Sequence, residues 1–100
     1  MRHQPTALAW IDPDASRATE WEAAQVHRLA RRLGYVLVWP RDYSPLPLSE
    51  QVRTADVDAL ITPTPDHLDP IRLNAVMHFA DVEIVCPRLS FARWSTIGAG

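Results

Sequence analysis

The sequence predicts an α/β fold: one small domain whose largely parallel sheet of four or five strands carries helices on both faces. Four short apolar runs alternate with helical patterns along the 100 residues, which is typical of strands joined by right-handed crossovers. Most of these runs are apolar without a break, as in strands covered on both faces. With 47% hydrophobic and 22% charged residues, the composition is that of one globular domain spanning residues 1–100, with its core in residues 6–87.

The first predicted strand is residues 7–11, ALAWI, which a turn follows. A helix is expected over residues 15–33, because its apolar side chains fall close to one stripe. Asp14 and Ser16 are the candidates to cap its start, and Gly34 stands where a left-handed residue ends a helix. The stripe consists of Trp21, Ala24, Val26, Leu29, Ala30 and Leu33.

The second predicted strand, residues 35–39 (YVLVW), is expected to be buried on both faces. Residues 40–47 contain three prolines and predict an irregular surface loop. A short helix capped by Ser49 is expected to run to about residue 54, and residues 57–62 (VDALIT) predict the third strand.

The segment TPTPDHLDP connects that strand to a helix that starts at Pro70, with Asp69 as its N-cap, and ends near residue 79 or 80. Residues 82–86 (VEIVC) predict a fourth strand, and the tail at 88–100 is expected to add an edge strand or half of a dimer contact, with a frayed end. The inward side of the last helix is expected to carry Ile71, Ala75, Val76 and Phe79.

Charge and composition exclude several function classes. Ten basic residues, all arginine, are spread along the chain against 12 acidic ones, so no concentrated basic face for direct nucleic-acid binding is expected. Three glycines are too few for a glycine-rich phosphate loop. The single Cys86 is expected to be a buried thiol in a reduced, cytoplasmic protein, and no run of about 20 apolar residues predicts a membrane span.

Carboxylates follow two of the predicted strands. Asp12 and Asp14 come after the first strand, and Asp66 and Asp69 after the third, so all four are expected at one rim of the sheet. Magnesium prefers such oxygen ligands, although turn and cap formation explains the same aspartates and is the favoured interpretation. His67 fits a general base or a metal ligand, but without a partner nucleophile a solvent-exposed loop histidine is favoured.

Aromatic and apolar side chains outside the predicted core are candidate partner contacts. Trp10, Trp21 and Trp39 lie on predicted buried elements and are expected in the core. Phe91 and Trp94 in the tail are either partner-binding anchors or packed back on the domain. An exposed apolar patch is expected to draw on this tail and on Tyr43, Leu46 or Leu48.

The order of ALAWI, a helix ending in LARRLGYVLVW, and ADVDALITPTPDHLDPIRLNAVMHFADVEIV resembles the N-terminal catalytic domain of the serine recombinases, the resolvase and invertase family. The likeness covers residues 7–86. Its best local match sets Asp58, Leu60, Asp66 and Leu68 against a strand of the type Asp-Xaa-Leu-Val-Val followed by Asp-Arg-Leu-Gly-Arg. It implies a resolvase-like fold.

The functional positions of that family are changed in this chain. The resemblance places Asp14 at the nucleophilic serine and Asp12 at a phosphate-binding arginine, while His67 and Pro70 take the places of two further arginines and Asp66 is kept. Carboxylates in place of cations repel a DNA phosphate, so the resemblance implies a former active site without catalysis.

We therefore expect a non-catalytic, cofactor-free domain that binds a protein partner or forms a homo-oligomer such as a dimer, in a regulator or accessory factor of DNA transactions. A shifted register would bring Ser16 to the nucleophile position but would leave the arginines missing. The alternative is a magnesium-dependent phosphate-handling or receiver-like domain using Asp12, Asp14 and Asp66, although the chain has no lysine for that family's usual cation.

Overall fold

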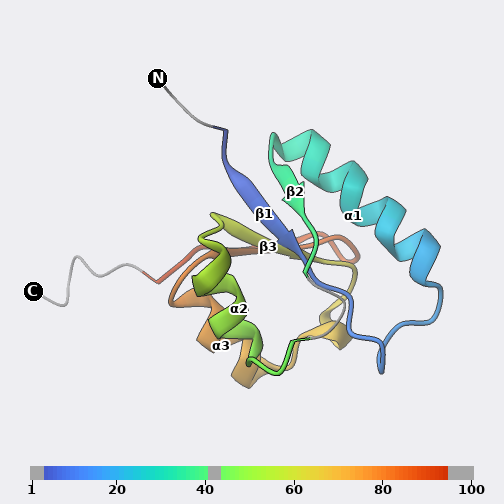
Figure 1. Cartoon of the computed structure of the whole chain (residues 1–100). Coiled ribbons are helices and arrows are strands. Elements are labelled where there is room, and N and C mark those ends of the chain that lie inside the picture. Colours follow the sequence, from blue (N-terminus) through green and yellow to red (C-terminus); the bar gives the residue numbers. More distant parts are fainter. Residues whose placement is uncertain (1–3, 41–43, 95–100) are drawn as a thin grey trace, which may run out of the picture.

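The computed structural model describes residues 4–40 and 44–94, which form five strands, three α-helices and one 3-10 turn (Figure 1). In chain order the elements are β1 (Thr6–Ala9), α1 (Thr19–Leu33), β2 (Val36–Val38), α2 (Leu48–Ala55), β3 (Ala59–Thr62), the 3-10 turn η1 (Pro65–His67), α3 (Pro70–Met77), β4 (Asp81–Ile84) and β5 (Leu89–Phe91).

The strands form one mixed sheet in the order β2-β1-β3-β4-β5. The first four strands are parallel and β5 is antiparallel to β4. Helix α1 covers one face of this sheet, whereas α2 and α3 cover the other (Figure 1). The predicted α/β fold with a mostly parallel sheet is confirmed, and so is the extra edge strand in the tail.

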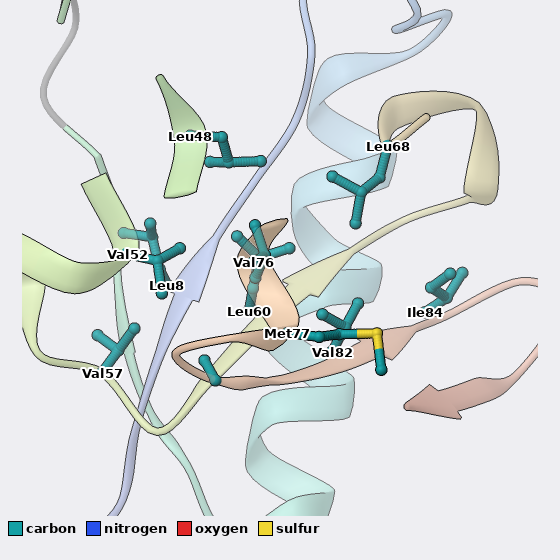
Figure 2. Packing of buried hydrophobic residues seen from close by; sticks show 11 residues of the cluster. Leu8, Leu48, Val52, Val57, Leu60, Leu68, Val76, Met77, Val82 and Ile84 are labelled. Atoms are coloured by element: carbon teal, nitrogen blue, oxygen red, sulfur yellow. The ribbon is translucent and has the colours of Figure 1, made fainter. Parts of the chain in front are cut away.

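Each face of the sheet has its own apolar core. The larger cluster fills the layer between the sheet and the pair α2 and α3 (Figure 2). It consists of Leu8, Leu48, Val52, Val57, Leu60, Leu68, Val76, Met77, Ala80, Val82 and Ile84. The smaller cluster lies under α1 and consists of Ala7, Ala9, Val26, Leu29, Ala30, Ala59 and Ile61. Alternate residues of β1 and β3 therefore point into opposite layers, as the pleat requires.

Local signals set one end of α1 and the start of α3. Gly34 has φ 84° and its N–H donates to the carbonyls of Ala30 and Arg31, so it ends α1 as predicted. Asp69 caps α3 by accepting from the N–H of Arg72, and Pro70 takes the first helical position, also as predicted.

The predicted starts of α1 and α2 were wrong. Helix α1 begins at Thr19 and its N-cap is Ala18, because the segment before it is bound to other parts of the molecule, as described below. Helix α2 begins at Leu48 after Pro47, so Ser49 lies inside the helix rather than at its cap.

Strand β2 is not buried on both faces, contrary to the prediction. It is an edge strand, and α2 and α3 pack over β1, β3 and β4 instead. Val36 and Val38 are therefore exposed on the α2 side, and Trp39, placed in the predicted core, is 42% exposed.

Further side chains predicted to be buried face outward, among them Leu33 at the end of α1, which is 38% exposed. Trp21 is 57% exposed on α1, and Ile71 is 82% exposed on the first turn of α3. Cys86 follows the end of β4 and is exposed as well. Each of them lies at or beyond an element end or on a flank that no neighbouring layer covers. No helix in the described part of the chain is both long enough and apolar enough to cross a membrane.

Candidate functional site

The carboxyl ends of β1 and β3, where the strand order reverses, carry the loops that the sequence singled out. Trp10 joins the two ends directly. Its N–H donates to the carbonyl of Ile61 at 2.9 Å, and its own carbonyl accepts from the Thr62 hydroxyl at 2.8 Å. Its indole N–H donates to the carbonyl of His67 at 2.9 Å. These three hydrogen bonds of Trp10 connect the loop after β1 to the end of β3 and to the loop that follows β3.

His67 is buried, with 1% exposure, which contradicts the predicted solvent-exposed loop histidine. The cause is the η1 turn: Thr64 caps it by accepting from the N–H of Asp66, and the turn directs His67 beneath the loop after β1. There its Nδ1 accepts from the N–H of Asp12 at 2.9 Å, and its Nε2 lies 3.5 Å from Oε2 of Glu22 on α1. Both ring nitrogens therefore have partners within the chain.

Glu22 is a buried carboxylate that the sequence analysis did not single out. The Ser16 hydroxyl and the Arg17 N–H donate to it. The Ser16 hydrogen bond is the largest influence and lowers the pKa of Glu22, against the effect of burial, so this carboxylate is ionised at neutral pH. A sequence signal existed, because Glu22 precedes Val26 by four residues and so lies on the apolar stripe of α1.

Arg72 on α3 supplies the cation of the site. Its Nε donates to Asp69 Oδ2 at 2.9 Å, and its terminal nitrogen donates to Asp12 Oδ2 at 3.2 Å. Its guanidinium also lies 5.8 Å from the centroid of the Trp10 ring, within cation–π range. The pKa of Asp69 is lowered, first by the backbone N–H of Arg72 and then by its side chain. This arginine is therefore held by two carboxylates.

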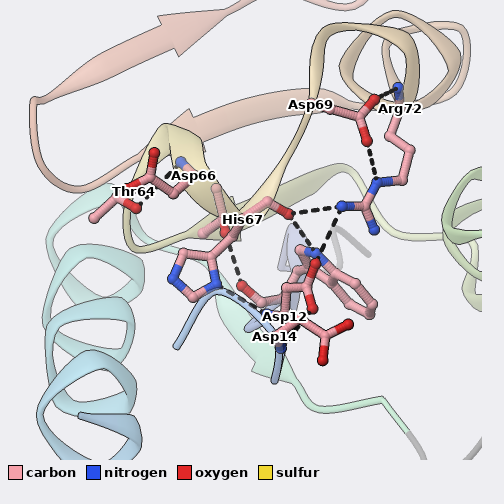
Figure 3. Close-up of polar contacts among 9 residues, drawn as sticks. Asp12, Asp14, Thr64, Asp66, His67, Asp69 and Arg72 are labelled. Carbon is pink, nitrogen blue, oxygen red and sulfur yellow. Dashed lines mark hydrogen bonds and ion pairs between the residues drawn. The ribbon is translucent and has the colours of Figure 1, made fainter. Parts of the chain in front are cut away.

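The carboxylates of the predicted rim are not gathered into one site (Figure 3). Asp12 accepts from the N–H of Asp14 as well as from Arg72. Asp14 and Asp66 are both exposed, and Pro70 only opens α3. Across residues 4–40 and 44–94, no three His, Cys, Asp or Glu side chains are grouped closely enough to hold a metal ion.

The hydrogen bonds of this cluster hold the loops after β1 and β3 in place. The Ser16 hydroxyl donates a hydrogen bond to Glu22. A nucleophile needs an adjacent base that can accept its proton and a reachable substrate position. His67 offers neither, because both of its nitrogens are engaged and its ring is buried.

The predicted partner contacts have separate environments. Phe91 on β5 packs partly against the larger core cluster. Trp94 is 49% exposed, yet its N–H donates to the Met77 carbonyl at 2.8 Å and its indole donates to Asn74 at 3.1 Å. Leu46 is exposed, whereas Tyr43 lies outside the described residues.

Two surface clefts flank the described part of the loop after β2. One, of about 420 Å³, lies between Trp10, Leu46, Ile71 and Arg72. The other, of about 540 Å³, lies between the end of β2 and helix α2. It is lined by Leu8, Val38, Trp39, Pro40, Ser44, Pro45, Leu46, Gln51, Thr54 and Ala55. The larger cleft exists because β2 extends past the edge of the α2 and α3 layer.

Comparisons with protein-family models, with curated proteins and with solved structures found no match to this chain.

Proposed function

We propose that this chain is a non-catalytic module that binds a protein partner or associates with itself. The resemblance to the serine recombinases would place such a module in a regulator or accessory factor of DNA transactions. The observation that carries the proposal is the exposed apolar surface at the end of β2, formed by Val38, Trp39 and Leu46 around the 540 Å³ cleft. Apolar side chains gathered at a hollow are typical of binding surfaces.

The polar residues of the neighbouring loops support the same proposal. The cation that would meet a phosphate, Arg72, is already bound by Asp12 and Asp69. The histidine that would act as a base, His67, is buried with both nitrogens engaged. These loops therefore contribute shape and rigidity, while the surface left for recognition is largely apolar.

The proposal is tested by affinity capture of the tagged chain from its native lysate, with sedimentation velocity of the purified protein alongside. We expect either one reproducible partner or a defined oligomer. The double variant Trp39→Ser/Leu46→Ser removes two exposed apolar side chains from the cleft and is expected to abolish that association.

Trp21→Ser is the matched control, because it removes from α1 a tryptophan that is even more exposed than Trp39. It is expected to keep the association. A second variant, Trp94→Ala, reports whether the tail takes part. A wild-type chain that sediments as a monomer and captures no partner would contradict the proposed function.

A further inference from the structure

We infer that protonation of His67 releases the first part of the loop after β1, residues 11–15, while the sheet and the helices stay folded. The His67 ring is the inner anchor of this segment, because its Nδ1 accepts from the Asp12 N–H at 2.9 Å. The ring is buried between the η1 turn, the loop and helix α1, so a change in its charge acts on its neighbours with little screening by salt. Such a contact makes the shape of this rim of the sheet depend on pH, whether or not a partner is bound.

The bond to Asp12 fixes which ring nitrogen carries the hydrogen. A backbone N–H can only donate, so Nδ1 must present its lone pair to Asp12 and carry no hydrogen. The one hydrogen of the neutral ring is then on Nε2, which faces Oε2 of Glu22 at 3.5 Å. A second proton can only enter at Nδ1. There it would point at the Asp12 N–H, so that two donors face each other and the hydrogen bond is lost.

The charge closest to the ring favours its protonated form. Glu22 on α1 is ionised, because the Ser16 hydrogen bond lowers its pKa, and an anion beside Nε2 stabilises an imidazolium. Arg72 on α3 opposes this, but its terminal nitrogen lies 3.5 Å from the His67 carbonyl rather than at the ring. The other charged residues of the surrounding loops are Asp12, Asp14, Arg17 and Asp66. The first of these is paired with Arg72, and the other three are exposed.

Little else attaches residues 11–15 to the rest of the molecule. The carbonyl and carboxylate of Asp12 bind the N–H groups of Asp14, Ala15 and Ser16, which are contacts within the loop itself. Figure 3 shows Asp12 between the His67 ring and Arg72. The pair with Arg72 is partly exposed at 3.2 Å and contributes little by itself. Ser16 and Arg17 are held separately by Glu22, so release stops before α1 begins.

Release of this segment changes the charge that the rim presents. Asp12 is one of the two carboxylates that bind Arg72, and Asp69 is the other. Arg72 and Trp10 also line the cleft of about 420 Å³. When Asp12 leaves, Arg72 keeps only Asp69, so mild acid makes the wall of this cleft more positive. Protonation of one buried ring thus reaches a surface to which the ring itself has no access.

An NMR titration of the full chain from about pH 8 to about pH 5, the range in which imidazoles generally gain a proton, tests this. The nitrogen shifts of the His67 ring report its protonation, and amide hydrogen exchange reports release of the loop. After correction for the intrinsic effect of pH, exchange of the Asp12 amide is expected to rise at least about tenfold. Its midpoint should coincide with that of the His67 ring. The amide of Leu60, which is buried on β3, is expected to stay protected.

Two histidine variants provide the matched comparison. His67→Gln supplies a side-chain carbonyl that can accept from the Asp12 N–H and does not titrate in this range, so the Asp12 amide is expected to stay protected at every pH. His78→Gln removes an exposed histidine of the segment after α3 and is expected to leave the response of the loop unchanged. If His67→Gln does not fold, the two midpoints of the wild-type chain still decide the question.

Several results would overturn the inference. An Asp12 amide that stays protected while the His67 ring takes up its second proton would do so, and so would a ring that is still neutral at the acid end of the titration. Loss of Leu60 protection together with that of Asp12 would show unfolding of the domain instead of local release. A response of the loop that persists in a folded His67→Gln variant, or that disappears in His78→Gln, would assign the effect to another group.

Discussion

His67 and Glu22 form a buried polar pair that holds the loop after β1 in place. The imidazole accepts from the Asp12 N–H on one side and faces the Glu22 carboxylate on the other, so the η1 turn, the loop after β1 and helix α1 meet at one side chain. Buried polar groups stabilise a fold only when each has its partner, and in the described residues no buried side-chain nitrogen or oxygen lacks one.

The first variant to test is therefore His67→Ala. It leaves the Asp12 N–H and the Glu22 carboxylate without their imidazole partner and opens a cavity, so we expect the free energy of unfolding to fall by about 2–4 kcal/mol. Urea denaturation followed by tryptophan fluorescence measures this loss. His78→Ala on the exposed end of α3 is the control and is expected to change stability by less than about 0.5 kcal/mol. Equal effects of the two variants would contradict the structural role of His67.

The lowered pKa of Glu22 predicts a pH dependence of stability. A carboxyl group whose pKa is lower in the folded state contributes stability above its ordinary value of about 4.3, and this contribution is lost as the pH falls through the folded-state pKa. Denaturant midpoints measured from pH 3 to pH 7 test this. The difference between wild type and Glu22→Gln is expected to be largest near pH 7 and to shrink in acid. A constant difference would show that ionisation of Glu22 is not involved.

At the residue scale, the sequence predicts local bonds and misses distant ones. Asp69 and Arg72 are three positions apart, so a helix cap between them was predictable. Glu22 and His67 are 45 positions apart, and their contact depends on how α1 lies over the sheet, which no short pattern contains. The carboxylates predicted at one rim do end near it, but Asp12 faces Arg72 whereas Asp66 faces solvent.

Among the elements, α1 illustrates the difference between a helix end set locally and one set by tertiary contacts. Gly34 ends the helix because its backbone needs positive φ, which glycine adopts without strain. The start was mispredicted because the preceding loop is held by His67, whose Nδ1 accepts from the Asp12 N–H, and because the Ser16 hydroxyl donates to Glu22. Tertiary hydrogen bonds thus delayed the helix by four residues relative to its apolar pattern.

The Gly34 C-cap gives a prediction free of packing effects, because an added Cβ would meet no atom within 4 Å. Gly34→Ala is expected to lower the free energy of unfolding by about 1 kcal/mol, from backbone strain alone. Gly34→Asn is the control and should cost less, since asparagine tolerates the left-handed region better. Thermal unfolding of the three proteins measures the order. An alanine variant as stable as wild type would contradict it.

For the whole molecule, two layers of unequal extent cover the sheet. The alternation of apolar runs and helical patterns was enough to predict a mostly parallel α/β sheet. The strand order was not predictable from that alternation, and it is the order that makes β2 an edge. The exposure of Val36, Val38 and Trp39 follows from this position rather than from their apolar character.

The charge of the whole molecule predicts weak binding to nucleic acid. The chain has a net charge of -2, and Arg53, Arg72 and Arg88 are each paired with a carboxylate. Without a cluster of free cations few counterions can be released, so we expect no retardation of duplex DNA at about 50 mM salt and micromolar protein. Electrophoretic mobility shift over a salt series measures this. Tight binding with a steep salt dependence would contradict this prediction.

Because β1 lies between β2 and β3 in the sheet, its two edges find their partners at different times during synthesis. Strand β1 pairs with β2, some 30 positions later, and with β3, more than 50 positions later, and the Thr6 N–H donates to Asp58. When the growing chain has emerged only as far as α2, β1 can pair with β2, but its other edge, which later pairs with β3, has no partner strand. Until β3 leaves the ribosome, that flank offers an unpaired apolar strand to any neighbour, so this is the interval in which chaperones are most needed.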